Sequence, residues 1–179
     1  MKCFSKYIII FVAVFLGSLF TIQAQKKPVN IKVAVKPLPP LEATYENGIK
    51  MRLKGFIVKK AFLEFDNGRK VPPDNKIELN HQIGLVVVIE GGWLLIDGKA
   101  YPGGSENIKL DNGYEILNTS DLFAAYSVHG VGAKEARYIS MKASITSIKN
   151  KHSFVIVNFR IWDKKSGNEI LGNYKFSIK

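Results

Sequence analysis

In the C-terminal part of this chain, apolar residues recur at every second position. Residues 139–145, 155–161 and 174–178 each show this alternation, with mainly polar residues between the apolar ones. A period of two is typical of a β-strand with one buried and one exposed face, because successive side chains point to opposite faces. Polar segments at 149–152 and 164–168 separate the three runs. The pattern predicts three antiparallel strands that pair in order as a meander.

Earlier segments extend the β pattern. Residues 83–89 are apolar without interruption and predict a central strand that is buried on both faces. Residues 31–35, 50–54 and 56–65 predict further strands. Asn-Gly pairs, which favour tight hairpin turns, recur between these segments at 47–48, 67–68 and 112–113.

Two connecting segments look irregular. Residues 100–105 contain one proline and two glycines and are predicted to form a loop. Residues 122–126 are predicted to form a single helical turn, which Thr119, Ser120 or Asp121 could cap.

Short strands, frequent turns and the lack of a long amphipathic helix together predict an all-β fold. The closest description is a two-sheet antiparallel β-sandwich, immunoglobulin-like or similar, of about eight to ten strands. The predicted organisation is a signal peptide at 1–24, an N-terminal strand and Pro-rich connection at 25–48, and the sandwich at 49–179. Two smaller sandwiches divided near Pro72 and Pro73 are the alternative.

The first residues predict export. Lys2 and Lys6 precede an apolar run at 7–16, and Ala24 offers a small residue for cleavage. The run is shorter than the about 20 residues that a membrane-spanning helix needs. We therefore expect a cleaved signal peptide, a periplasmic, cell-surface or extracellular location, and no transmembrane span in the mature chain.

Cysteine content and net charge limit the kinds of site and partner that we expect. Cys3 is the only cysteine and lies in the predicted leader, so the mature chain would have no disulfide and no cysteine ligand or nucleophile. Loss of Lys2 and Lys6 lowers the formal net charge from +11 to +9. Such a charge fits either a solvated basic surface or attraction to an anionic polysaccharide, lipid or surface. No nucleic-acid motif is present, so nucleic acid is not expected as a partner.

Exposed aromatic residues are the main candidates for ligand binding. Trp93 follows two glycines, and Tyr101 precedes Pro-Gly-Gly, with Lys99 between them. A flat ring beside polar groups suits a sugar or a peptide, so Trp93, Lys99 and Tyr101 are the predicted ligand-binding residues. The alternative for Trp93 is a place in the sandwich core, and the same alternative applies more strongly to Trp162.

Catalytic and metal-binding patterns are weak. The chain has no HExxH motif, no G-x-S-x-G motif and no EF-hand loop, so no catalytic residue, metal or cofactor is predicted. A glycosidase would need two facing carboxylates, for which Glu90, Asp97 and Glu106 are the candidates. Calcium could use loop oxygens near Asp66, Asp74, Asp97 and Asp111.

Several segments resemble small exported β-sandwich proteins of unknown function from Bacteroidetes. The similar segments are residues 62–70, 74–75, 103–105, 121–123 and 161–167, and the leader end at Ala24-Gln25. The resemblance covers most of residues 62–178 and implies export and a β-sandwich fold. It implies no activity and no site residues.

These observations predict an exported, non-enzymatic module that binds a glycan, an envelope component or a protein partner. The alternatives are a small hydrolase that acts on envelope polysaccharide through Glu90 or Glu106, and a basic adhesion module for anionic surfaces.

Overall fold

The computed structural model describes residues 40–78, 80–144 and 154–178. The predicted leader at 1–24 and the predicted strand at 31–35 lie outside these residues. The described chain is built from strands and three short 3₁₀ helices. The strands are β1 (Leu41–Thr44), β2 (Lys50–Lys54), β3 (Ile57–Phe65), β4 (Lys76–Ile77), β5 (Gln82–Gly91), β6 (Lys99–Ala100), β7 (Pro102–Leu110), β8 (Glu115–Asn118), β9 (Val131–Gly132), β10 (Tyr138–Ser144), β11 (Val155–Asp163) and β12 (Glu169–Ile178). The 3₁₀ helices are η1 (Glu46–Gly48), η2 (Ala124–Tyr126) and η3 (Glu135–Arg137).

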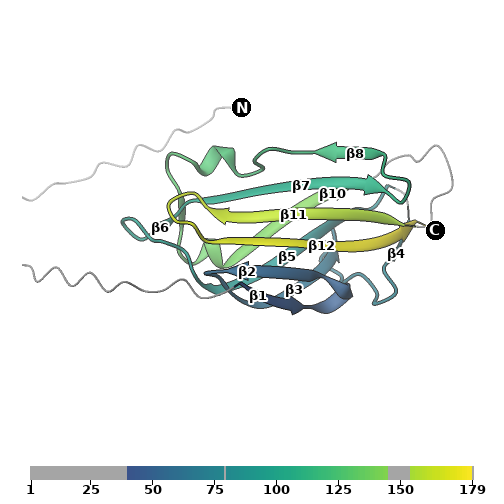
Figure 1. Ribbon diagram of the computed structural model, residues 1–179, viewed down its shortest axis with the longest axis horizontal. Coiled ribbons are helices and arrows are strands. Elements are labelled where there is room, and N and C mark those ends of the chain that lie inside the picture. Colours follow the sequence, from purple (N-terminus) through teal and green to yellow (C-terminus); the bar gives the residue numbers. More distant parts are fainter. Residues whose placement is uncertain (1–39, 79, 145–153, 179) are drawn as a thin grey trace, which may run out of the picture. The chain divides into compact units, whose positions relative to one another are not determined.

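Two sheets pack face to face (Figure 1). The larger sheet has the strand order β1-β2-β12-β11-β7-β8, with β4 pairing in parallel to the end of β12. The smaller sheet has the order β10-β5-β3, and β6 and β9 form a separate two-stranded ribbon. All pairings other than β4–β12 are antiparallel. The structure confirms the predicted all-β, two-sheet antiparallel sandwich. Its larger sheet begins at Leu41, before the position 49 at which the sandwich was predicted to start.

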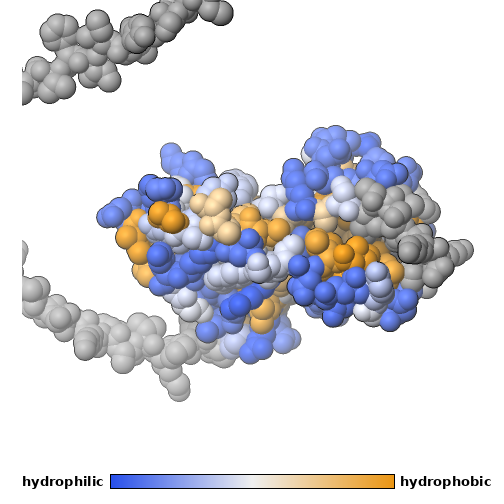
Figure 2. Space-filling model, turned by 90° about the horizontal axis from the view of Figure 1, so that it is seen from above, coloured by the Kyte–Doolittle hydropathy of each residue, from blue (hydrophilic) through white to orange (hydrophobic). Residues whose placement is uncertain are grey.

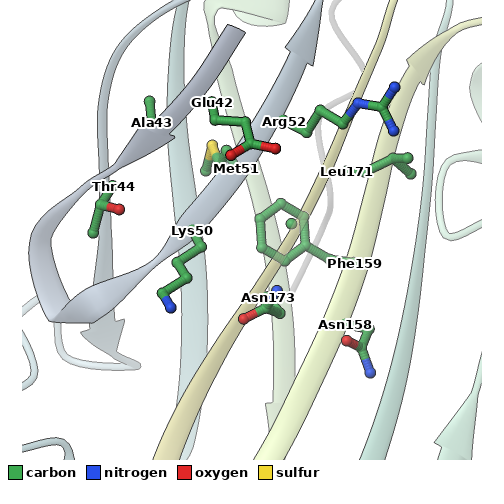
Figure 3. Close-up of a pocket in the computed structure, with 11 residues that line it drawn as sticks. Glu42, Ala43, Thr44, Lys50, Met51, Arg52, Asn158, Phe159, Leu171 and Asn173 are labelled. Carbon is green, nitrogen blue, oxygen red and sulfur yellow. The ribbon is translucent and has the colours of Figure 1, made fainter. Parts of the chain in front are cut away.

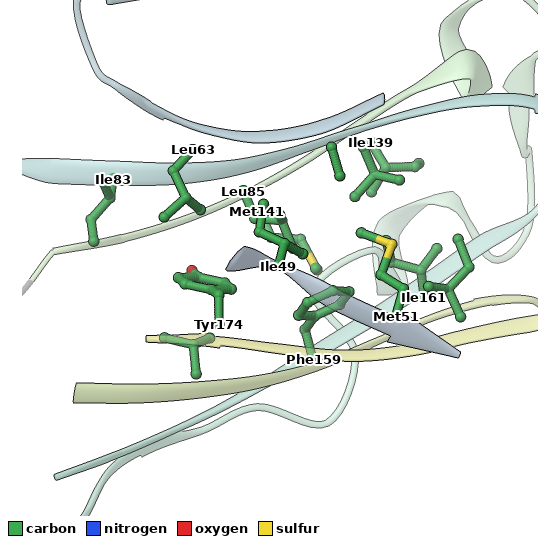
Figure 4. Close-up of a cluster of buried hydrophobic side chains, with 14 of the residues drawn as sticks. Ile49, Met51, Leu63, Ile83, Leu85, Ile139, Met141, Phe159, Ile161 and Tyr174 are labelled. Carbon is green, nitrogen blue, oxygen red and sulfur yellow. The ribbon is translucent and has the colours of Figure 1, made fainter. Parts of the chain in front are cut away.

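The core lies between the sheets, as the alternation predicts. In β11, Val155, Val157, Phe159 and Ile161 are buried, while Asn158 and Arg160 point outward and are exposed. Facing side chains from the smaller sheet complete the cluster (Figure 4). They include Ala61, Leu63, Ile83, Leu85, Val87, Ile89, Ile139 and Met141. Burial of this apolar surface is the main stabilising contribution to the fold.

Strand β5 is central and buried on both faces, which confirms the prediction for residues 83–89. Its outward residues Val86 and Val88 are each only 8% exposed. Their neighbours in the register include Phe62 for Val86 and Tyr138 for Val88. Large side chains from the flanking strands therefore cover the outer face of this strand.

The predicted meander is wrong. Strand β10 pairs with β5 in the smaller sheet, whereas β11 pairs with β12 and β7 in the larger sheet. The chain thus changes sheets between β10 and β11, and the connection at 145–153 lies outside the described residues. Alternation shows that a strand has one buried face, but it does not identify the partner strand, so the pairing could not follow from it.

The predicted loop at 100–105 is also wrong, since β7 begins at Pro102 and β6 ends at Ala100. A Cβ atom at Gly103 would lie 2.1 Å from the ring of Trp162, and one at Gly104 would lie 2.5 Å from the ring of Phe123. The glycines are therefore strand residues that leave space for aromatic rings, and not loop residues.

Local turns follow the sequence more closely. Asn47 and Gly48 have positive φ values of 57° and 67° in the β1–β2 hairpin, as the Asn-Gly signal predicts. The Asn47 side chain also accepts a hydrogen bond from the Leu63 amide and donates to Asn75 Oδ1, so this hairpin is tied to β3 and to the loop before β4.

The predicted helical turn at 122–126 corresponds to η2. Asp121 Oδ1 accepts hydrogen bonds from the amides of Phe123 at 2.9 Å and Gly104 at 3.2 Å, which fixes the start of this segment on β7. No helix in the described ranges is long and apolar enough to cross a membrane.

Candidate functional site: the outer face of the larger sheet

A row of asparagine side chains crosses the outer face of the larger sheet. The register places Asn118 beside Asn107, Asn107 beside Asn158, and Asn158 beside Asn173, on the neighbouring strands β8, β7, β11 and β12. Directly paired residues project from the same face of an antiparallel sheet. We call Asn107, Asn118, Asn158 and Asn173 the amide row, and Lys50 of β2 continues it next to Asn173. Each amide can both donate and accept hydrogen bonds.

A guanidinium group and an indole ring lie next to the amide row. Arg160 is two residues from Asn158 on the same face of β11, and its guanidinium carbon lies 5.0 Å from the ring centroid of Trp162. Glu169 Oε2 accepts hydrogen bonds from Arg160 Nε at 3.0 Å and pairs with Nη2 at 2.8 Å. The Trp162 ring covers Gly103 on the adjacent strand. Arg160 is thus held against the ring by an ion pair and a cation–π contact.

The same face is hollowed over β1, β2, β12 and β11. The hollow has a volume of about 580 Å³, and outward side chains of Lys50, Arg52, Asn158, Leu171 and Asn173 line it (Figure 3). Gly172 pairs in the register with Met51 and Phe159, which are buried, and the Phe159 ring fills the position that a Cβ atom at Gly172 would take. Besides Leu171, the apolar residues Ala43, Met51 and Phe159 also line it, so the hollow is open and has both polar and apolar walls.

Basic residues outnumber acidic residues on this face. The outward basic residues are Lys50, Arg52, Lys54, Lys109, Arg160 and Lys175, and the outward acidic residues are Glu42, Glu115 and Glu169. Glu115 lies 4.0 Å from Lys109, and Glu169 pairs with Arg160, so two of these acids have a basic partner. The face therefore attracts anions.

The predicted ligand-binding residues lie elsewhere, around the β6 ribbon. Trp93 is half-buried against the core, its Nε1 donates to the Ala136 carbonyl at 3.0 Å, and its ring packs edge-on against Phe56 at 4.7 Å. Lys99 is exposed on β6, and the Lys165 ammonium lies over the Tyr101 ring at 4.6 Å. Lys99 and Tyr101 both border Gly130. A ligand role for these three residues stays a prediction, and the Trp93 contacts are those of a packing residue.

Sequence reasoning missed the outer face as a site, although the signal was present. Asn158, Arg160 and Trp162 are the polar or aromatic partners of the buried residues in β11, and the alternation alone places them on one face. Their proximity to Asn107 and Asn173 depends on which strands pair, and the sequence pattern does not predict that pairing.

The three candidate acids lie in separate environments. Glu90 is exposed and pairs with Lys59 at 2.8 Å, and the hydrogen bond from Lys59 lowers the pKa of Glu90. Asp97 lies in a tight turn with a φ of 52°. Glu106 is only 2% exposed, and its Oε1 has no hydrogen-bond partner among the described residues. Burial raises the pKa of Glu106 to about 7.

This arrangement does not form the pair of facing carboxylates that glycoside hydrolysis needs. Glu106 is enclosed in the core beside Tyr174, whose pKa is raised well above its usual value by burial and, to a lesser degree, by the charge of Glu106. Glu90 lies on the surface of the other sheet. Within the described residues, no group of three His, Cys, Asp or Glu side chains could hold a metal ion.

No protein-family model and no curated protein match this chain. Among solved structures, the crystal structure of the C-terminal domain of Wzt is similar, with a TM-score of 0.42 and 12% sequence identity over 78% of each chain. A likeness at this level carries no conclusion about function, so the function is argued from the geometry of the face.

Proposed function

We propose that this protein is an exported, non-enzymatic module that binds a glycan across the outer face of its larger sheet. The observation that carries the proposal is the amide row beside Arg160 and Trp162 on one exposed, hollowed surface. Sugar hydroxyls are both donors and acceptors, which amide groups match, and Arg160, held against the Trp162 ring, adds a charged donor beside them.

The charge of this face favours an anionic glycan. Lys50 and Arg52 line the hollow, and Lys175 lies further along β12. A guanidinium group can bind a carboxylate or a phosphate through two parallel hydrogen bonds, and an ammonium group adds a point charge. A polyuronate or a phosphorylated polysaccharide would therefore fit better than a neutral chain.

The test uses polygalacturonate as an anionic probe and a neutral glucan as its comparator. Isothermal titration of the chain from Gln25 should show binding to polygalacturonate that weakens steeply with added salt, since exposed charges are screened. Arg52→Ala should reduce the affinity, whereas Lys142→Ala, on the exposed face of β10 in the other sheet, should leave it unchanged. Equal loss in both variants, or tighter binding to the neutral glucan, would contradict the proposal.

A further inference from the structure

A second surface with different chemistry lies at the end of the sandwich that carries β6. Leu94, Leu95 and Ile96 are consecutive and are 48%, 46% and 40% exposed. A single exposed leucine needs no explanation, but three in a row on a projecting loop do. The loop projects from this end of the described residues, and apolar surface is visible there in the space-filling view (Figures 1 and 2).

The loop is held rigidly in its exposed position. The Leu94 amide donates to the buried carboxylate of Asp163 at 2.7 Å. Ile96 and Lys99 exchange two backbone hydrogen bonds, of 2.9 and 3.0 Å, and the turn between them uses positive φ values at Asp97 and Gly98. A tight hairpin with defined ends therefore presents these apolar side chains to solvent.

A second loop, whose end packs against β6, also exposes apolar side chains. Tyr126 is 45% exposed and Val128 is 75% exposed. The turn that contains Val128 closes with a hydrogen bond from the Gly130 amide to the Tyr126 carbonyl, and Gly130 packs against the backbone of Ala100 in β6. We call Leu94, Leu95, Ile96, Tyr126 and Val128 the apolar tip.

Basic side chains surround the apolar tip. The exposed ones are Lys99, Lys134, Arg137 and Lys165, against exposed Asp97 and Glu135 and against Glu90, which is neutralised by Lys59 at 2.8 Å. Two further acids contribute little negative charge to the surface. Asp121 pairs with Lys164 at 2.7 Å, and Asp163 is buried and accepts hydrogen bonds from Leu94, Lys165 and Ser166.

We propose that this end docks on an anionic phospholipid bilayer, with the apolar tip in the interface and the lysines at the headgroups. Projecting apolar loops can insert into a lipid bilayer, which deforms around them, whereas a peptide or protein partner would need a complementary pocket for each loop. Tyrosine places an apolar ring and a polar hydroxyl at such a boundary, and lysine keeps its ammonium in water while its stem contacts apolar atoms. Basic residues near the surface add attraction to anionic lipid.

The experiment is co-sedimentation of the chain from Gln25 with vesicles of phosphatidylcholine alone or of phosphatidylcholine with phosphatidylglycerol. We expect sedimentation with the phosphatidylglycerol vesicles and at least tenfold weaker partition of the double variant Leu95→Ser, Ile96→Ser. The matched control is Tyr114→Ser, which changes a 67% exposed side chain in the turn at the far end of β7 and should partition like the unchanged protein. The single variant Val128→Ser, at the most exposed position of the apolar tip, should also weaken partition and covers the case in which the double variant does not fold.

Failure of the unchanged protein to sediment with either vesicle would overturn the proposal, as would equal loss in the Tyr114 control. Partition that does not depend on phosphatidylglycerol would overturn the anionic part of it. The double variant should keep its affinity for polygalacturonate, so this result is independent of the glycan proposal.

Discussion

The two tryptophans of this chain lie in two regions where the aromatic ring makes different contacts. Trp93 packs edge-on against Phe56, and its N–H is bonded to the Ala136 carbonyl. Trp162 lies on the outer face of the larger sheet, over Gly103 and next to Arg160. The first ring is part of the packing at one end of the sandwich. The second lies next to the amide row on the outer face of the larger sheet. The comparison indicates that the contacts of an aromatic residue, rather than its type, distinguish a packing role from the ligand role proposed for the outer face.

The largest effect should come from Trp93→Ala, which removes a packed ring and leaves the Ala136 carbonyl without its donor. We expect the free energy of unfolding to fall by about 3 kcal/mol, as for other large-to-small substitutions in packed sites. Urea denaturation measures it, with Trp93→Phe as the comparison that keeps a smaller aromatic ring and loses the hydrogen bond. A Trp93→Ala protein of unchanged stability that no longer binds glycan would reverse the roles assigned to the two tryptophans.

The second prediction concerns the pH dependence of stability, which depends on the buried carboxyl of Glu106. Its pKa is raised from 4.5 to about 7 in the folded protein, so folding favours the protonated carboxyl. The folded state then binds more protons than the unfolded state between these values, and stability is full below about pH 4.5 and falls as pH rises to about 7. The shift corresponds to about 3 kcal/mol.

The measurement is urea denaturation across this pH range, with Glu106→Gln as the comparison. The amide keeps the shape of the side chain and cannot ionise, so the variant should be more stable than the unchanged protein at pH 8 and similar to it at pH 4. A stability that falls from pH 5 to pH 7 by the same amount in both proteins would show that Glu106 is not the group responsible.

Trp162→Ala tests whether the outer face of the larger sheet binds the glycan. We expect affinity for polygalacturonate to drop by about tenfold, or about 1.4 kcal/mol, because Arg160 loses the ring that holds it in place. The loss of stability should be smaller than that of Trp93→Ala. Trp162→Phe should keep part of the affinity. The distinction between the two regions would disappear if Trp162→Ala unfolded the protein at the same urea concentration as Trp93→Ala.

The smallest effect should come from the amide row. Asn158→Ala removes one hydrogen-bonding group from an exposed position, so we expect about 1 kcal/mol of lost binding free energy and little change in stability. Ser140→Ala, an exposed polar residue on β10 in the other sheet, is the matched control for titration with the same probe. Equal losses in the two variants would argue against a ligand on the larger sheet.

The sequence predicted the strands better than their arrangement. Alternation in β2, β11 and β12 identified which residues are buried, because one face of each strand meets the core. It could not assign β10 to the other sheet, because pairing depends on contacts distant in sequence. Composition predicts a loop at Gly103 and Gly104, because their role, space for the rings of Trp162 and Phe123, exists only in the folded protein.

The candidate site also depends on contacts between residues that are distant in sequence. Asn158 and Arg160 were polar positions in a predicted strand, whereas Asn107, Asn118 and Asn173 lie outside the predicted strand ranges. The amide row is formed by four strands that are brought together only by the sheet order β12-β11-β7-β8. The residues preferred from sequence, Trp93, Lys99 and Tyr101, were neighbours along the chain, which is the only proximity that a sequence displays. The burial of Glu106 was equally hidden, since a glutamate between Ser105 and Asn107 looks like a surface residue.

Chemical-shift mapping by NMR tests the central claim most directly. Isotope-labelled protein, titrated with a short oligogalacturonate, should show its largest changes in the side-chain amides of Asn107, Asn158 and Asn173 and in the indole N–H of Trp162. Changes confined to Trp93, Lys99 and Tyr101, with the amide row unaffected at saturation, would contradict the account and return the site to the β6 end.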